Sequence, residues 1–134
     1  MLPMNFSVEH LGLPARNPAT LRDWYVAKFG ASCIAPNGAA PPFFIRLPGA
    51  GTTLEIYGAT GSSPQTGDNG LAGWRNVALR VDSIEIARKE LEACGVTFVD
   101  PIKSAAGGGR LLFFKDGEDN LLHLVERPAD SVFR

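Results

Sequence analysis

The chain has 134 residues, of which 45% are hydrophobic and 20% are charged, and its formal net charge is −1. This composition is typical of a soluble globular protein and excludes a disordered or fibrous chain, and the length suits a single domain over residues 1–134. Because lysine and arginine form no run, we expect no nucleic-acid partner.

The sequence predicts neither a membrane span nor a secretion signal. No stretch approaches the roughly 18 apolar residues that a membrane-spanning helix needs, and the opening MLPMNFSVEH has no basic segment followed by a long apolar one. We therefore expect a cytoplasmic protein with no membrane partner. Cys33 and Cys94 follow no metal-binding or redox spacing, so we expect reduced thiols that are buried as small hydrophobic residues.

The first half of the chain predicts a strand, a helix and further strands. An alternating strand in VEHLGL leads to a helix for which Asn17 is the expected N-cap and Pro18 the first residue. Apolar residues then recur at helical spacing, and Gly30 is placed to end the helix. The runs PPFFIRL and TTLEIYG, with glycine and proline between them, predict strands joined as antiparallel hairpins.

The second half repeats this order after a linker. The segment GATGSSPQTGDNG, residues 58–70, is rich in glycine and serine, as linkers are. WRNVALRV then predicts a strand, and Asp82 is the expected N-cap of a second helix, with Glu85 completing a capping box and Gly95 ending the helix. VTFVD, RLLFF and NLLHLVE predict three more strands.

Aligning the two halves selects four polar residues. His10 falls opposite Asn76 on the first strands, and Glu55 falls opposite His123 on the last strands. Because side chains alternate along a strand, the aliphatic neighbours of all four point to the other face, which we expect to pack on the helix. The four should then lie on the face without a helix.

These four residue types suit a metal ion. A lone polar residue in a strand is more often a hydrogen-bonded core residue or a solvated surface one, but four at repeat-equivalent positions favour a shared site. Two imidazoles, one carboxylate and one amide match the donors that Zn, Ni, Mn or ferrous iron accept. We therefore predict metal ligands at His10, Glu55, Asn76 and His123.

Four further residues are candidates for contacts with a substrate. Arg80 and Tyr57 share the strand parity of the candidate ligands, so they can offer a guanidinium to an anionic group and a hydroxyl; a solvated position is the alternative. Phe44 and Phe114 are candidates for an apolar wall, although phenylalanines in strands are more often core.

The segment AAGGGR, residues 105–110, lacks the G-x-x-x-x-G-K-[ST] pattern of a phosphate-binding loop and the strand and helix that such a loop needs. Two possibilities stay open for it. One is a flexible flap with Arg110 as its charged tip, and the other is a plain hairpin connection.

Several segments resemble landmarks of the vicinal oxygen chelate superfamily, which includes glyoxalase I, bleomycin and fosfomycin resistance proteins and extradiol dioxygenases. They are the opening EHLGL, the helix ending in FG, NVALRVDS before a helix ending in CGV, and the close KDGEDNLLHLVE. The resemblance implies an α+β fold of two βαβββ modules, about residues 5–58 and 71–127, whose mixed sheets form a partly closed cup, usually within a homodimer. The family's metal ligands lie on the first and last strands of each module.

The second module departs from the family pattern, because Asn76 stands where histidine is frequent and His123 where glutamate is usual. The resemblance implies a metal-dependent lyase, isomerase or dioxygenase acting on a small oxygen-chelating substrate, with Glu55 or an unligated His123 as the base. His10, His123 and Glu55 also approximate the two-histidine, one-carboxylate set of ferrous dioxygenases. The alternative is a metal-free module that binds a small molecule, as bleomycin-sequestering relatives do.

Overall fold

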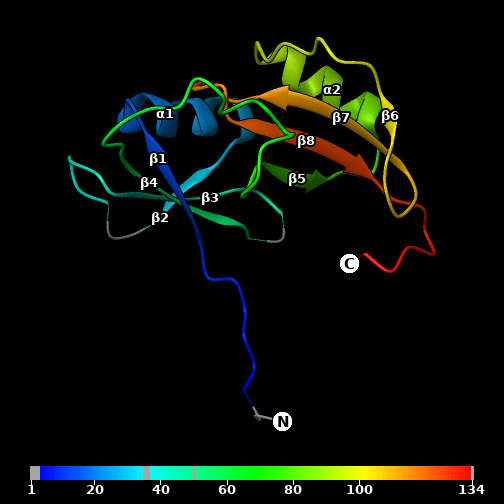
Figure 1. The fold of residues 1–134 in the computed structure, drawn as a ribbon, viewed down its shortest axis with the longest axis horizontal. Helices are drawn as coiled ribbons and strands as arrows, with labels where there is room; N and C mark the ends of the chain where they lie inside the picture. Colours follow the sequence, from blue (N-terminus) through cyan, green and yellow to red (C-terminus); the bar gives the residue numbers. More distant parts are fainter. Residues whose placement is uncertain (1–3, 35–36, 50, 134) are drawn as a thin grey trace. The chain divides into compact units, whose positions relative to one another are not determined.

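The computed structural model describes residues 4–34, 37–49 and 51–133. The contacts within the chain divide it into two compact units, Met1–Ser62 and Ser63–Arg134, which we call module one and module two. Each module has one helix and one four-stranded sheet (Figure 1). The protein is therefore of the α+β class, as predicted, with two modules of the same kind.

Module one contains a strand, a helix and three more strands. They are β1 (Leu11–Ala15), α1 (Pro18–Phe29), β2 (Ser32–Ile34), β3 (Phe43–Arg46) and β4 (Thr53–Gly58). The order in the sheet is β1-β4-β3-β2, in which β1 and β4 are parallel and the other neighbours antiparallel. A parallel pair needs a long crossover connection, and α1 lies within the one between β1 and β4.

Module two repeats this arrangement. Its elements are β5 (Asn76–Arg80), α2 (Ile84–Ala93), β6 (Lys103–Ser104), β7 (Arg110–Lys115) and β8 (Leu121–Glu126). The sheet order β5-β8-β7-β6, with β5 parallel to β8, matches that of module one strand for strand. The predicted order of elements in the two halves is confirmed.

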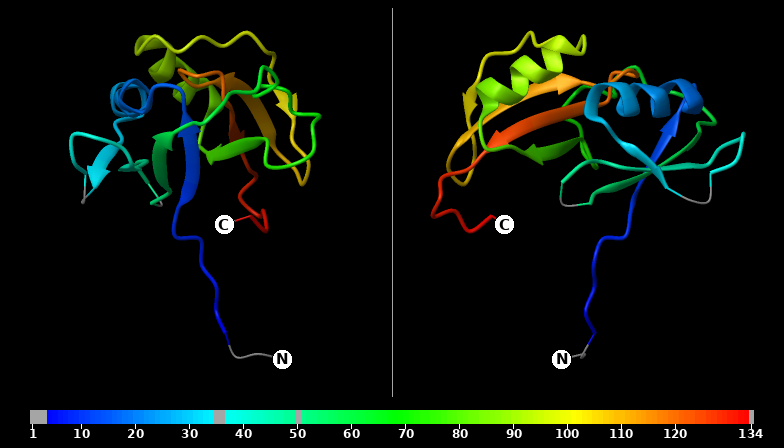
Figure 2. Two further views of the ribbon diagram at one scale, coloured as in Figure 1. Left: turned by 60° about the vertical axis from the view of Figure 1, so that its left-hand side comes forward. Right: turned by 180° about the vertical axis from the view of Figure 1, so that it is seen from behind.

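Each helix packs on one face of its own sheet, as Figures 1 and 2 show. In module one, Leu21 and Tyr25 of α1 are buried with Ile45 and Ile56 of the sheet. In module two the corresponding core residues are Ile84, Leu91, Leu112, Phe114, Leu122 and Leu124. Burying each such side chain contributes about 1.5–3 kcal/mol to folding. The opposite face of each sheet has no helix of its own module, and we call it the open face.

The helix ends follow the sequence with one correction. Proline begins α1 at Pro18, and Gly30 ends it in the left-handed conformation at φ 66°. The N-cap of α2 is Ser83 and not Asp82, because the Ser83 hydroxyl accepts a hydrogen bond from the Ile86 N–H. Asp82 and Ser83 are adjacent and both are residue types that favour the N-cap position, so the local sequence alone does not determine which of them caps α2.

Two other predictions are wrong. Residues 96–100 form no strand, although Val96 and Phe98 are buried. The strand at the edge of the sheet, next to β7, is the short β6 further along the chain. Cys33 and Cys94 form no disulfide, as expected, but they are exposed rather than buried. Cys33 lies on β2, the edge strand of its sheet, and Cys94 directly follows α2, so both occupy margins of their modules. No helix in the described part of the chain is long and apolar enough to cross a membrane.

Candidate functional site

The open face of module one holds the first pair of predicted ligands. Glu55 on β4 pairs with Gly12 on one side and Phe44 on the other, and paired residues share a face of the sheet. Its neighbours Leu54 and Ile56 are buried on the helix side. The predicted face of Glu55 is thus confirmed.

His10 lies just before β1 and reaches Glu55 across the sheet. The imidazole Nε2 is 3.6 Å from Oε1 of Glu55, and Nδ1 is 2.9 Å from Oε1 of Glu9. The ring therefore lies between two carboxylates, and the Phe44 ring is nearly perpendicular to it, with the two ring centroids 6.0 Å apart. A proton on Nδ1, donated to Glu9, leaves the Nε2 lone pair directed towards the Glu55 side.

Tyr57 lies on the same face as Glu55, two residues further along β4, and its side of the strand is open. Its ring covers Gly12, since a Cβ added to Gly12 would meet Cε1 of Tyr57 at 3.4 Å. The exposed Tyr57 phenol thus lies over residue 12, on the face that carries Glu55.

Module two places the second pair in the same relationship. His123 on β8 pairs with Ala78 on β5, two residues beyond Asn76, just as Glu55 pairs with Gly12, two residues beyond His10. Asn76 and His123 therefore share the open face, as predicted. The amide nitrogen of Asn76 donates a hydrogen bond to Oδ1 of Asn69 at 2.7 Å, which leaves the Asn76 amide oxygen available.

The imidazole of His123 has an apolar environment. Its ring centroid is 4.9 Å from that of Phe113, and its Nδ1 atom is buried with no hydrogen-bond partner among the described residues. Burial, and second the positive charge of Arg127, lower the pKa of His123. The ring is consequently neutral at pH 7, as a metal ligand or a general base must be.

Of the two predicted wall residues, Phe44 lies on the open face and Phe114 does not. Phe114 is only 4% exposed and packs in the helix-side core, with its ring centroid 5.2 Å from that of Phe98. The neighbouring Phe113 pairs with His123 and takes the open face. Strand alternation identifies one of the two phenylalanines, but choosing between them requires the register of β7 against β8.

Arg80 points to the open face, and its guanidinium donates a hydrogen bond to the backbone carbonyl of Phe133.

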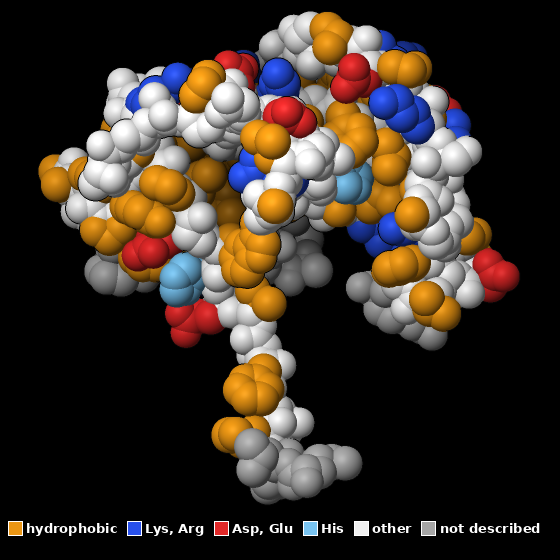
Figure 3. Space-filling model, viewed as in Figure 1, with side chains coloured by type: hydrophobic (Ala, Val, Ile, Leu, Met, Phe, Trp, Pro, Cys, Tyr) orange, Lys and Arg blue, Asp and Glu red, His pale blue; other side chains and the backbone are white. Residues whose placement is uncertain are grey.

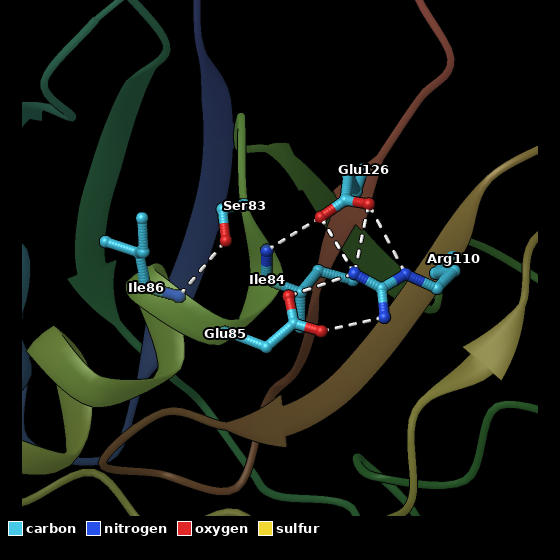
Figure 4. Close-up of polar contacts among 6 residues, drawn as sticks. All are labelled: Ser83, Ile84, Glu85, Ile86, Arg110 and Glu126. Carbon is cyan, nitrogen blue, oxygen red and sulfur yellow. Dashed lines mark hydrogen bonds and ion pairs between the residues drawn. The ribbon is translucent and has the colours of Figure 1, made fainter.

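Arg110 does not lie at the tip of a loop. It lies within β7 and binds both Glu85 of α2 and Glu126 of β8, while Glu126 also accepts from the backbone N–H of Ile84 (Figure 4). Hydrogen bonds from Arg110 lower the pKa of Glu85.

The glycine-rich segment forms the connection between β6 and β7. The N–H of Ala105 bonds to the carbonyl of Gly109 at 3.0 Å, as in a closed hairpin turn. Arg127 donates to the carbonyls of Ala106 and Gly108 at 2.6 Å. These bonds favour the hairpin connection over the flap.

Within the described residues no three His, Cys, Asp or Glu side chains gather closely enough to hold a metal ion. Each module contributes a pair instead, and the surroundings of the pairs differ. His10 lies between the carboxylates of Glu9 and Glu55, whereas His123 lies against the Phe113 ring. Figure 3 shows histidine side chains on this face of the molecule in pale blue. The chemistry of the first pair fits a cation, because its imidazole has a carboxylate on each side.

Comparison with known proteins agrees with this architecture. A family model, the Glyoxalase/Bleomycin resistance protein/Dioxygenase superfamily, matches residues 7–124. A glyoxylase/bleomycin resistance protein/dioxygenase domain from Frankia sp. EAN1pec has 19% identity and a TM-score of 0.72, with 95% of this chain and 96% of that one covered. A superfamily member from Sphaerobacter thermophilus DSM 20745 has 26% identity and a TM-score of 0.66, with 94% and 100% covered.

A third similar structure carries a metal. It is the fosfomycin resistance protein FosX from Listeria monocytogenes complexed with Mn(II) and sulfate, with 19% identity, a TM-score of 0.68, and 95% of this chain and 94% of that one covered. No curated protein matches the sequence. The family match covers most of the chain and the folds agree over nearly all of it, so this protein belongs to the glyoxalase/bleomycin resistance protein/dioxygenase superfamily.

Proposed function

We propose that the protein is a divalent-metal-dependent enzyme, a lyase, isomerase or dioxygenase, that acts on a small oxygen-chelating substrate. The observation that carries the proposal is the His10–Glu55 pair, with Nε2 and Oε1 3.6 Å apart and Glu9 behind the imidazole. A carboxylate on the far nitrogen fixes the tautomer and raises the basicity of a ligating histidine. His123 and Asn76 are the further donors of the set.

The donor types allow Zn, Ni, Mn or ferrous iron. A similar fold, that of FosX, is known with Mn(II). Bound to such donors, a divalent ion supplies Lewis acidity to two substrate oxygens and stabilises the negative charge that develops on them.

The protein's own side chains have separate tasks. Glu55, or His123 where it does not ligate, accepts the proton that the substrate loses, and the neutral state of His123 suits that role. Tyr57 offers a hydroxyl on the same face as Glu55, and the Phe44 ring packs against His10. Arg80 is the proposed contact for an anionic group of the substrate.

A second candidate function is metal-free binding of a small molecule. The observation that favours it lies in module two, where the His123 ring packs against Phe113 at a tilt of 58° and the Asn76 amide is hydrogen-bonded to Asn69. An aromatic surface beside one polar atom is typical of a pocket wall for an apolar ligand. For either function we propose a cytoplasmic homodimer, to be checked by light scattering of the purified protein.

Elemental analysis separates the two functions. Protein purified without chelator or a nickel column is loaded with Zn, Ni, Mn or ferrous iron, desalted and measured. The enzyme proposal expects about one ion per chain, with loss of most of it in His10→Ala, Glu55→Gln and His123→Ala. Asp23→Asn, an exposed carboxylate on α1, is the matched control.

Two results would contradict parts of this proposal. Unchanged metal content in His123→Ala would remove that residue from the ligand set. Protein that retains none of the four ions, while folded by circular dichroism, overturns the metal-dependent function and favours the binding module.

A further inference from the structure

Module two has three basic side chains on its open face, Arg80, Lys103 and Arg127, which we call the basic face. Arg80 is on the open side of β5, as the pairing of Ala78 with His123 shows. Lys103 pairs with Leu111 of β7, which is two residues before Phe113 and therefore shares its side. Arg127 follows β8 at the parity of His123. All three emerge on the side away from α2.

Two sets of contacts hold these side chains, one around Phe113 and one around Phe133. The Lys103 ammonium is 5.9 Å from the centroid of Phe113, which in turn lies against His123. Arg127 is near enough for its charge to act on the His123 imidazole. Its guanidinium stacks 4.0 Å from the centroid of Phe133, whose carbonyl oxygen accepts the hydrogen bond from Arg80.

No carboxylate of β5 to β8 lies on the basic face within the described residues. The strands β5 to β8 contain one acidic residue, Glu126, and it lies on the helix side, bound to Arg110 and to the N–H of Ile84. The hydrogen bonds of Arg80 and Arg127 go to backbone carbonyl oxygens, which carry no full charge. Within the described residues none of the three basic side chains forms an ion pair with a carboxylate, in contrast to the acid-flanked His10 of module one.

We propose that the basic face binds the oxyanion of a small organic molecule, a carboxylate or a phosphoryl group attached to an apolar or aromatic body. Arg80, Lys103 and Arg127 supply the charge, and Phe113 packs against the apolar part. The guanidinium groups of Arg80 and Arg127 already donate hydrogen bonds to backbone carbonyl oxygens. Both groups are therefore placed where an oxygen acceptor can reach them. Anions with an apolar or aromatic body thus become the substrate class of the proposed function. This assignment rests on the proposal that the protein binds a small molecule.

Titration of the isotopically labelled full-length protein, followed by amide NMR, tests the assignment. The probes are phenylphosphonate, benzoate and the neutral benzamide, at constant ionic strength and in the presence of EDTA. We expect the two anions to bind at least tenfold more tightly than benzamide and to shift signals of Phe113 and His123. A preference between the two anions identifies which oxyanion the face takes.

Matched variants complete the experiment. Arg80→Gln and Lys103→Gln should each weaken anion binding about three- to tenfold, whereas Lys89→Gln on α2, on the other side of the sheet, should not change it. Equal binding of benzamide, no binding of either anion at millimolar concentration, or the same loss in Lys89→Gln overturns the proposal. EDTA removes divalent ions, so the titration measures anion binding without metal. A protein that retains no metal can still bind the anions, and one that retains metal can fail to bind them. The two tests therefore distinguish failure of one proposal from failure of the other.

Discussion

The Nδ1 atom of His10 lies 2.9 Å from Oε1 of Glu9, on the side of the ring away from Glu55. Glu9 is 90% exposed, so its interaction with the ring is partly screened by water. We expect Glu9→Gln to weaken metal retention about tenfold, the lower end of the effect of such supporting carboxylates. Dialysis against graded chelator measures the change, and Asp23→Asn should retain the ion as the unaltered protein does. Equal retention in Glu9→Gln would make the contact incidental.

Acid should destabilise module two through His123. Burial, and then Arg127, lower the pKa of this imidazole in the folded protein. Below the ordinary value of about 6.5, the unfolded chain takes up a proton that the folded protein resists, so stability is full above that pH and is lost as the pH falls towards the folded pKa.

Urea unfolding of the metal-free protein at pH 7.5 and pH 5.5 measures this effect. We expect the midpoint of the unaltered protein to fall more between the two pH values than that of His123→Gln, which does not titrate there. Equal falls in both proteins would show that His123 contributes nothing to the acid dependence.

Neighbouring glycines of the β6–β7 connection should respond unequally to alanine. Gly108 and Gly109 have φ values of 95° and 100°, which cost alanine about 1–2 kcal/mol. A Cβ on Gly109 would lie 1.9 Å from the Glu126 carbonyl oxygen, whereas on Gly108 it meets nothing closer than 3.7 Å. Gly109→Ala should therefore lower the free energy of unfolding by about 3 kcal/mol or more, and Gly108→Ala by about 1–2 kcal/mol, as measured by urea denaturation.

Both cysteines should react in the native state. Cys33 and Cys94 are exposed and form no disulfide, so a thiol reagent should reach them without unfolding. Titration with a chromogenic disulfide should give the same number of thiols before and after denaturation. A second, slower group of thiols released only by denaturant would place one of them in the interior.

The order of elements and the open-face positions were predictable because both depend on local pattern. Helix periodicity with Pro18 and Gly30 located α1, and strand alternation placed Glu55 and His123 opposite buried neighbours. The positions of the helices and the face on which each strand residue lies follow from such local spacings and do not depend on contacts between distant segments.

The remaining features depend on contacts between distant segments. The choice of Phe113 over Phe114 needs the register of β7 on β8, and the exposure of Cys33 follows from the edge position of β2. Residues 96–100 have the alternation of a strand but form none of the sheet's ladders. The basic face likewise joins residues from β5, β6 and the end of β8, far apart in sequence.

The duplicated fold carries two different electrostatic characters. In module one His10 lies between two carboxylates, whereas in module two His123 lies against the Phe113 ring and is affected by the positive charge of Arg127. A duplication in which each copy keeps its own core leaves the open-face residues of each copy to diverge independently. Substitutions on the open face of one copy should therefore leave the core and the fold of the other copy unchanged, so that the two faces can be varied one at a time.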